Sequence, residues 1–394
     1  MGQCVAAKPV AGRIDAVRME SLDGLRGIAA IAVLLHHVRL PPTGFIWGYL
    51  AVDFFFLLSG YVIGTVYEAR FQAGLGVRAY MLQRLERLYP MIIIGGLLGL
   101  LCWSIAVPTG YFGIEGEVGW FAVLVSFFLL VPFTASRTAY VHNPAQWSIM
   151  FELCANLFHA VFYRWLKTWM LAVIVGLGFL ALLVIADRHW VINYGWGVDN
   201  AHLGVPRVVF SYFLGVLLFR LEKHWIARVP VLPAWFPALL LFCLLGQPST
   251  TISQLFNHYR DPLIIGLAFP ALLMLGRVST GFGKASRALG VLSYPLYLVQ
   301  GGMLTLGEHL LARVQIGSGG AFYAVLLAGG AIVVGVSYLL GIYVDEPLNA
   351  WRRKTRRRRM LAAAPFAGPE PESGLEPALV PVPAPVLSGQ AIPS

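Results

Sequence analysis

The stretch LDGLRGIAAIAVLLHHVRL, residues 22–40, joins a long apolar run to ionisable side chains near both of its ends. Asp23 and Arg26 stand at the start of the run, and His36 and His37 close it. An apolar run of this kind is typical of a helix that crosses a membrane, where ionisable groups are costly and face a cavity or a partner. The stretch therefore predicts a membrane helix whose ionisable side chains face a cavity or a partner.

The composition of the whole chain is that of a membrane protein. Of the 394 residues, 58% are hydrophobic and only 12% are charged, and the mean hydropathy of +0.72 lies well outside the range of soluble domains. The 24 Phe, 16 Tyr and 11 Trp suit a chain that crosses the membrane interface many times. We expect an all-α fold, a polytopic bundle of membrane helices in a lipid bilayer.

The net charge of +10 does not indicate a nucleic-acid-binding protein. The basic residues form short clusters between apolar runs, a distribution that the positive-inside rule explains. The four cysteines have no metal-ligand or redox spacing. His142, His202 and His258 fall in expected external loops, too far apart in sequence to indicate a metal site. We expect neither a nucleic-acid partner nor a metal.

Eleven segments are apolar enough to be membrane-helix candidates, since a spanning helix needs roughly 20 mostly apolar residues. They lie near residues 24–40, 45–66, 90–107, 118–134, 147–163, 168–186, 204–221, 232–246, 261–278, 289–311 and 320–343. The basic segment 352–359 and the basic residues before position 20 place both termini in the cytoplasm, which requires an even number of crossings.

One of these segments must therefore fail to cross. If 118–134 is a re-entrant or interfacial element, every strong basic cluster becomes cytoplasmic and about ten transmembrane helices remain. The alternative is that 118–134 crosses and another segment does not, which leaves one basic cluster outside. The expected division is a cytoplasmic N-terminal segment (1–20), a membrane domain (21–353), and a basic, then proline-rich, disordered tail (354–394).

Arg26 and His37 share one face of the first helix. They are eleven residues apart, and eleven steps of about 100° return almost to the starting direction. A rise of about 1.5 Å per residue puts His37 roughly 16 Å beyond Arg26, near the middle of the hydrocarbon layer. Asp23 is a local i,i+3 partner for Arg26. His37 is either a functional imidazole or a neutral one satisfied by a neighbouring helix.

The segment AVDFFFLLSGYVIG, residues 51–64, carries Asp53 in an aromatic run. Gly60 and Gly64 follow on the same helix face as Asp53, so another helix or a ligand can approach this stripe closely. Asp53 then either lines a cavity or makes a hydrogen bond in helix packing.

The segment AYMLQRLERLYP, residues 79–90, places Arg84 and Arg87 one turn apart before Pro90. Guanidinium groups bind phosphate oxygens in pairs, so the two side chains suit a ligand with several phosphates. Positive-inside anchoring is the alternative explanation.

The segment beginning NPAQWSIMFELCANLFHA, residues 143–160, forms a polar ribbon on an apolar helix. Ser148, Glu152 and His159 lie on one stripe, with Asn156 beside it. Trp147 marks the expected outer interface, and the buried Glu152 needs a partner that a His of the first helix would supply. In LSYPLYLVQ (292–300) and YVDEPLNAWRR (343–353), packing and helix-end roles explain the polar residues.

Together these segments resemble the acyltransferase-3 family of bacterial inner-membrane proteins, over residues 21 to about 353. The first helix is similar to the family's pattern of Arg, ten residues, then His, at Arg26 and His37. DFFFLLSGYVI, RLERLYP, WSIMFE and SYPLYL resemble four further blocks of the family, in the same order. The last block ends in His in many relatives, whereas this chain has Gln300.

The resemblance implies an enzyme that O-acylates an extracytoplasmic carbohydrate, with acetyl-CoA or another acyl-CoA as the cytoplasmic donor. The implied catalytic residues are His37, as general base or as first acceptor of the acyl group, Glu152 to orient it, Arg26 and Asp53. Arg84 and Arg87 would bind the donor, and Trp147 and Ser148 the substrate. A proton-coupled transporter or flippase is the alternative, although the chain lacks similarly interrupted helices in its two halves.

Overall fold

The computed structural model describes residues 10–38, 45–106, 120–132, 139–140, 142–247, 254–314 and 320–363. Within these ranges the regular structure is helical, apart from one isolated β-bridge between Pro233 and Thr280. The all-α prediction is therefore confirmed. The proline-rich tail lies outside the described residues from position 364 onward, so its predicted disorder stays a prediction.

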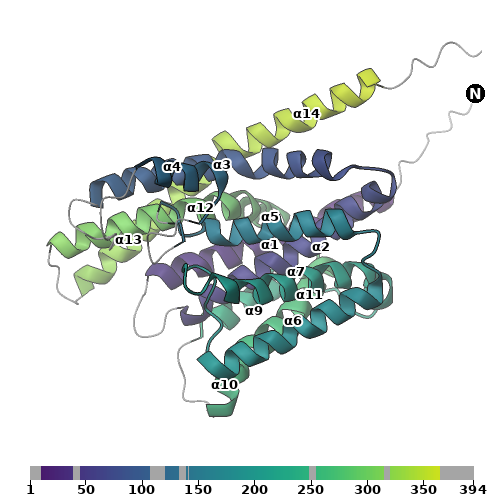
Figure 1. The fold of residues 1–394 in the computed structure, drawn as a ribbon, viewed down its shortest axis with the longest axis horizontal. Coiled ribbons are helices and arrows are strands. Elements are labelled where there is room, and N and C mark those ends of the chain that lie inside the picture. The colour runs from purple at the N-terminus through teal and green to yellow at the C-terminus, as the bar shows by residue number, and fades with distance from the viewer. Residues whose placement is uncertain are drawn as a thin grey trace, which may run out of the picture. The chain divides into compact units, whose positions relative to one another are not determined.

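Figure 1 shows the helices coloured in their order along the chain. The α-helices are α1 (Val10–Val38), α2 (Ala51–Gln72), α3 (Val77–Ala106), α4 (Trp120–Leu129), α5 (Gln146–Phe162), α6 (Thr168–His189), α7 (Gly204–Arg220), α8 (Glu222–Trp225), α9 (Trp235–Leu245), α10 (Gln254–Leu263), α11 (Phe269–Val278), α12 (Gly283–Val314), α13 (Gly320–Leu340) and α14 (Glu346–Ala363). Two 3₁₀ turns, η1 (Ile46–Leu50) and η3 (Ala201–Leu203), and two π-helical turns, η4 (Ile264–Ala268) and η5 (Gly341–Asp345), complete them.

Eight helical stretches of the described residues are long and apolar enough to cross a membrane. They are Glu20–Val38, Trp47–Gln72, Val77–Cys102, Thr168–His189, Ala201–Arg220, His258–Val278, Gly283–Leu311 and Gly320–Arg356. The sequence predicted about ten; the segments at α5 and α9 have only 17 and 11 helical residues. These eight candidate spans confirm the prediction of a polytopic membrane protein. Helices suit this environment because they satisfy their own backbone hydrogen bonds in lipid.

Segment 118–134 contributes α4, whose described part is ten residues long. At a rise of about 1.5 Å per residue, such a helix extends roughly 15 Å, about half of a hydrocarbon layer. Whether segment 118–134 is re-entrant, interfacial or spanning stays a prediction. Leu130, directly after α4, has a left-handed backbone with φ 55°, and the helix ends there.

α2 and α7 pack at very short range because two glycines face the partner backbone. A Cβ on Gly60 would lie 1.9 Å from the carbonyl oxygen of Tyr212, and a Cβ on Gly215 would lie 2.1 Å from that of Leu57. Neither position therefore accepts a side chain without movement of a helix. The stripe of Asp53, Gly60 and Gly64 predicted from the sequence is thus the interface with α7, where Gly64 meets the ring of Phe219.

Other helices of the first unit pack in further pairs. α1 packs chiefly against α12, which also contacts α3 and α13, and α6 packs against α7, beside which it runs in Figure 1. Residues Met1–Asn349 and Ala350–Ser394 form two separate units, and the residues discussed below belong to the first. The predicted division at residues 20 and 353 stays a prediction.

Candidate active site

A cavity of about 230 Å³ lies among α1, α2, α3, α5 and α12 of the first unit. Its polar lining comes from all five helices: Asp23 and Arg26, Ser59, Arg84 and Arg87, Ser148 and Glu152, and Ser293, Tyr294 and Tyr297. Apolar side chains of α2, including Phe55, Phe56 and Ile63, complete the wall. The cavity therefore combines an apolar surface with a few convergent polar groups, as binding sites generally do.

Arg26 enters the cavity from α1 and is held from two sides. Its Nε donates to Ser293 Oγ at 2.8 Å, and its Nη2 donates to the carbonyl of Gly290 at 3.3 Å. Asp23 Oδ1 lies 3.1 Å from Nη2, which confirms the predicted i,i+3 pair. The guanidinium thus has a fixed orientation toward α12.

Glu152 connects three helices at the centre of the cavity. Its Oε1 accepts a hydrogen bond from Arg84 Nη2 at 2.7 Å and another from Ser59 Oγ at 2.6 Å. The predicted partner of Glu152 was the imidazole of His37; the structure instead gives it an arginine of α3 and a serine of α2. Arg84 Nε is buried without a hydrogen-bond partner, so this guanidinium retains an unused donor.

Arg87 lies one turn beyond Arg84 and has its own carboxylate. Its Nη1 donates to Asp345 Oδ1 at 2.7 Å, and its guanidinium lies 5.3 Å from the centre of the Tyr294 ring. Asp345 is the last residue of the π-helical turn η5, a local widening of the helix that often accompanies functional sites.

Ser148 and Tyr297 line the cavity and share a hydrogen bond of 2.6 Å between their hydroxyl oxygens. Tyr294, one turn earlier on α12, donates to the carbonyl of Leu88 at 2.7 Å. The late Ser-Tyr block, for which packing seemed a sufficient explanation, therefore forms part of the cavity wall.

The charges around the cavity are balanced in pairs. Arg26, Arg84 and Arg87 each contact a carboxylate, in Asp23, Glu152 and Asp345 respectively. Three guanidinium groups in one small space suit an anionic ligand or a developing negative charge. Because each is already oriented by a carboxylate, little reorganisation is needed when charge develops nearby.

Asp53 does not line the cavity. It is fully buried and forms an ion pair with Arg207 of α7, whose Nη2 lies 2.5 Å from Asp53 Oδ2. Arg207 also donates to the carbonyls of Tyr194 and Tyr49. We name Asp53 and Arg207 the sealed pair. Of the two roles open to Asp53, the structure shows helix packing, because Arg207 occupies the carboxylate and α7 covers it.

Trp147 packs against the sealed pair and is not exposed at a lipid interface. Only 7% of its surface is accessible, and its ring lies 5.4 Å from the guanidinium of Arg207 and beside Phe56 and Phe151. The expected interface marker is therefore a core residue. Ser148, next in the chain, does reach the cavity.

His37 lies one residue before the end of α1 and is exposed. The ring is not among the side chains that line the cavity, and its expected mid-layer position stays a prediction. Its Nδ1 lies 2.8 Å from the carbonyl oxygen of Val33 and must be the protonated nitrogen, because a carbonyl only accepts. Nε2 then carries the lone pair.

His142 lies in the connection before α5, and its side chain is buried. Its Nε2 lies 2.6 Å from Gln146 Oε1, and burial lowers the pKa of His142 to about 4, so the ring is neutral at pH 7. Among the residues that the structure describes, no group of three or more His, Cys, Asp or Glu side chains is placed to hold a metal ion.

Sequence reasoning did not single out Ser59, Arg207 or Asp345. Arg207 stands alone in the apolar run VPRVVFSYF, and an isolated arginine within a membrane helix is itself a signal. Ser59 lies in the Asp-aromatic-Ser-Gly block, and Asp345 in the acidic pair before Pro347. Their partners, Glu152 and Arg87, are 93 and 258 residues away, so spacing cannot reveal the pairs.

A helical membrane bundle with a cavity of guanidinium, carboxylate and hydroxyl groups is the kind of site that polar group transfer requires. The sequence profile of the acyltransferase domain matches residues 19–342. The chain belongs to the acyltransferase-3 family and is a multi-pass membrane acyltransferase. This assignment favours the enzyme over the transporter alternative.

Three curated proteins illustrate the relationship. The chain is 26% identical to the peptidoglycan O-acetyltransferase OatA of Listeria monocytogenes over 329 residues, 75% of this chain and 51% of the relative. It is 24% identical to the acyltransferase MdmB of Streptomyces mycarofaciens, over 89% of this chain and 95% of the relative. It is 32% identical to protein 2 in the picA locus of Rhizobium radiobacter over 161 residues, 36% of this chain and 80% of the relative.

The chain thus spans about half the length of the Listeria protein. No solved structure is significantly similar to it.

Proposed function

We propose that this protein transfers an acyl group, acetyl in the simplest case, from a cytoplasmic acyl-CoA to a hydroxyl of an extracytoplasmic carbohydrate. The observation that carries the proposal is the cluster of Arg26, Arg84 and Arg87 around one cavity in a membrane acyltransferase. The similarity to OatA, a peptidoglycan O-acetyltransferase, supports a carbohydrate acceptor. The membrane is the bacterial inner membrane, with both termini cytoplasmic.

The donor carries phosphates and a thioester, and the cavity offers groups for both. Arg84 and Arg87 would bind phosphate oxygens, for which planar guanidinium groups are well suited. Arg26 would stabilise the negative charge that develops on the carbonyl oxygen or on the departing thiolate. Ser148 would hydrogen-bond the transferred group from the opposite wall, where Tyr297 fixes its hydroxyl.

The reaction itself needs a base for the acceptor hydroxyl. The hydroxyl oxygen attacks the thioester carbonyl, the C–S bond breaks, and the thiolate takes up a proton as CoA leaves. We assign the removal of the hydroxyl proton to His37, whose Nδ1–H is fixed on Val33 so that Nε2 is the basic nitrogen. His37 and Arg26 lie on the same helix face, so a donor arm would run along α1 for roughly 16 Å.

Labelled acetyl-CoA tests the proposal directly. Membranes containing the protein should transfer label to surface glycan, and the variant His37→Ala should abolish the transfer while its amount in the membrane stays unchanged. His36→Gln is the matched control, because His36 neighbours His37 at a ring distance of 5.3 Å and makes its own contact with Phe45. Retained transfer by His37→Ala would remove His37 from the mechanism.

The donor site has a separate test. Arg84→Ala should raise the concentration of acetyl-CoA needed for half-maximal transfer. Arg78→Ala is its control, since Arg78 is exposed near the start of the same helix. An unchanged donor requirement would favour the anchoring explanation for Arg84. Comparison of ester-linked substituents on surface glycans with and without the gene identifies the acceptor.

A further inference from the structure

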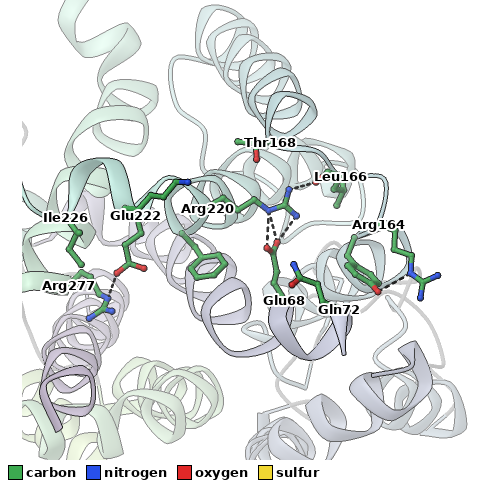
Figure 2. A pocket seen from close by; sticks show the side chains of 12 residues that line it. Glu68, Gln72, Arg164, Leu166, Thr168, Arg220, Glu222, Ile226 and Arg277 are labelled. Carbon is green, nitrogen blue, oxygen red and sulfur yellow. Dashed lines mark hydrogen bonds and ion pairs between the residues drawn. The ribbon is translucent and has the colours of Figure 1, made fainter. Parts of the chain in front are cut away.

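A second and larger cavity, of about 1080 Å³, lies away from the candidate active site. Figure 2 shows Arg220 and Glu68 facing each other at its centre, with the Arg277 and Glu222 pair to one side and Arg164 to the other. These side chains come from the end of α2, the connection from α5 to α6, and α7, α8 and α11. The cavity is therefore built where several helices end.

The lining of this cavity is cationic. It holds four basic side chains, Arg164, Arg220, Lys223 and Arg277, against two carboxylates, Glu68 and Glu222. Arg220 Nη2 lies 2.7 Å from Glu68, and Arg277 Nε lies 3.0 Å from Glu222, so both carboxylates are already paired. The lining thus keeps a net charge of +2.

The two remaining cations are exposed at the cavity. Arg164 donates to the neutral hydroxyl of Tyr163 at 3.0 Å, which leaves its charge uncompensated, and Lys223 is exposed in α8. Guanidinium and ammonium groups together form charge-assisted hydrogen bonds with phosphate oxygens. The chemistry of the cavity therefore favours a phosphate-bearing ligand.

The ends of the candidate spans place this cavity at a membrane surface. Gln72 and Arg220 are the last residues of two spans, and Thr168 is the first residue of a third; all three line the cavity. Trp165 and Trp169 stand beside it with 61% and 64% of their surface exposed. Exposed tryptophans at this level are typical of the lipid headgroup region.

An exposed apolar stripe on α6 continues from the cavity along the span. Trp169 is followed by Val173, Leu177, Leu180 and Val184, all on one helix face and all exposed. A phosphate in the cavity would therefore have a surface for hydrocarbon chains directly beside it. A soluble phosphate compound would make no use of that stripe.

We propose that the cavity among α2, α6, α7, α8 and α11 binds the phosphate head group of an anionic phospholipid, with the lipid chains along α6. Basic pockets between membrane helices bind such head groups in other proteins. The site is separate from the candidate active site and does not depend on the proposed reaction.

Native mass spectrometry of the full chain, released from detergent with phosphatidylglycerol or with phosphatidylcholine, tests the proposal. We expect the wild type to retain phosphatidylglycerol in preference to phosphatidylcholine. Because each basic side chain near an anionic lipid contributes about fivefold to binding, the double variant Arg164→Gln/Lys223→Gln should lose about 25-fold in affinity.

The matched control is Arg188→Gln/Arg313→Gln, which removes two charges in the last turns of α6 and α12. It should bind phosphatidylglycerol like the wild type. Unchanged thermal unfolding in phosphatidylcholine verifies that the cavity variant is folded. Equal loss in both double variants, or no loss in either, would overturn the site.

Soluble anions separate the lipid from other sources of phosphate. Inorganic phosphate and adenosine 3′,5′-bisphosphate should stabilise the wild type against thermal unfolding much less than phosphatidylglycerol does. If either stabilises it equally, and the cavity variant loses that effect, the ligand is a soluble phosphate compound and the lipid proposal is wrong.

Discussion

Two arginine–carboxylate pairs of the helix bundle differ in their access to a cavity. Arg84 and Glu152 line a cavity, with 15% and 20% of their side chains exposed, and Arg84 keeps an unused Nε donor. The side chains of Arg207 and Asp53 are only 1% and 0% exposed. Arg207 also donates hydrogen bonds to the carbonyls of Tyr194 and Tyr49.

The difference shows that a buried charge in a membrane helix does not by itself identify a site. The sealed pair has the same chemistry as the cavity pair, but a ligand cannot reach it. A buried ion pair whose donors are satisfied holds helices together, whereas one beside a cavity can change partners. The comparison predicts that the two pairs respond to substitution in different measurements.

The largest effect is expected for the sealed pair, in stability. Asp53→Ala leaves Arg207 buried without its carboxylate, which should cost about 3–5 kcal/mol of unfolding free energy. Thermal unfolding in detergent and the amount of folded protein in the membrane measure the loss.

The double variant Asp53→Ala/Arg207→Met is the control for this prediction. It removes both charges, so it should recover part of the lost stability relative to Asp53→Ala alone. If Asp53→Ala has normal stability but loses acyl transfer, Asp53 acts in the active site and the structural role of the sealed pair is wrong.

The cavity pair should respond in activity. Glu152→Gln keeps the shape of the side chain and an oxygen that can accept from Ser59, but it removes the charge that orients Arg84. We expect acyl transfer to fall about 100- to 1,000-fold, as for loss of one preorganised electrostatic group.

Stability is the second readout for Glu152→Gln. The protein should unfold at a temperature nearer to that of the wild type than Asp53→Ala does, because this pair is partly exposed. If Glu152→Gln were instead as destabilising as Asp53→Ala, with normal activity in the folded fraction, both pairs would be structural.

Asp345 extends the comparison to a carboxylate that does not itself line the cavity but pairs with Arg87, which does. Asp345→Asn should weaken the orientation of Arg87, raising the KM for acetyl-CoA about tenfold with little change in kcat, the expectation for a lost charged hydrogen bond. Glu346→Gln, the exposed neighbour, is the control. A fall in kcat with an unchanged KM would contradict the positioning role.

The smallest effect is expected at the hydroxyl pair of the cavity wall. Tyr297→Phe removes the hydrogen bond to Ser148 but keeps the ring, and Ser148 retains its contact with the carbonyl of Ala145. A loss of about 1 kcal/mol, or roughly fivefold in transfer rate, follows from one neutral hydrogen bond. The transfer rate of Tyr297→Phe is compared with that of Tyr294→Phe, which keeps the hydrogen bond to Ser148. The difference shows whether that hydrogen bond contributes to the rate.

The helical membrane fold was predictable because it depends on local properties. Apolar runs near the length of a membrane span predict helices wherever they occur, and the run that starts at Arg26 belongs to a described span. The number of crossings was less accessible, since α5 and α9 are shorter than their apolar runs suggested. Helix ends depend on caps and tertiary contacts rather than on hydropathy.

The membership of the site was predictable only in part, and its pairing was not. Arg26, Arg84, Arg87, Ser148 and Glu152 all reach the cavity, because each is a polar residue in an apolar segment. Helix periodicity gives the face on which a residue lies but not the neighbour that it meets. His37 was therefore the predicted partner of Glu152, whereas Arg84 and Ser59 are its partners in the structure.

Asp53 of the sealed pair lies six residues before Ser59 on α2, about 9 Å along the helix axis and about 120° around it. Asp53 binds α7, while Ser59 reaches Glu152 across the other side. Sliding or turning α2 would have to break an ion pair in a place where water cannot replace it. The depth at which the serine meets the carboxylate is consequently fixed by a contact outside the cavity, and substitutions remote from the reacting groups can alter the geometry in which they meet.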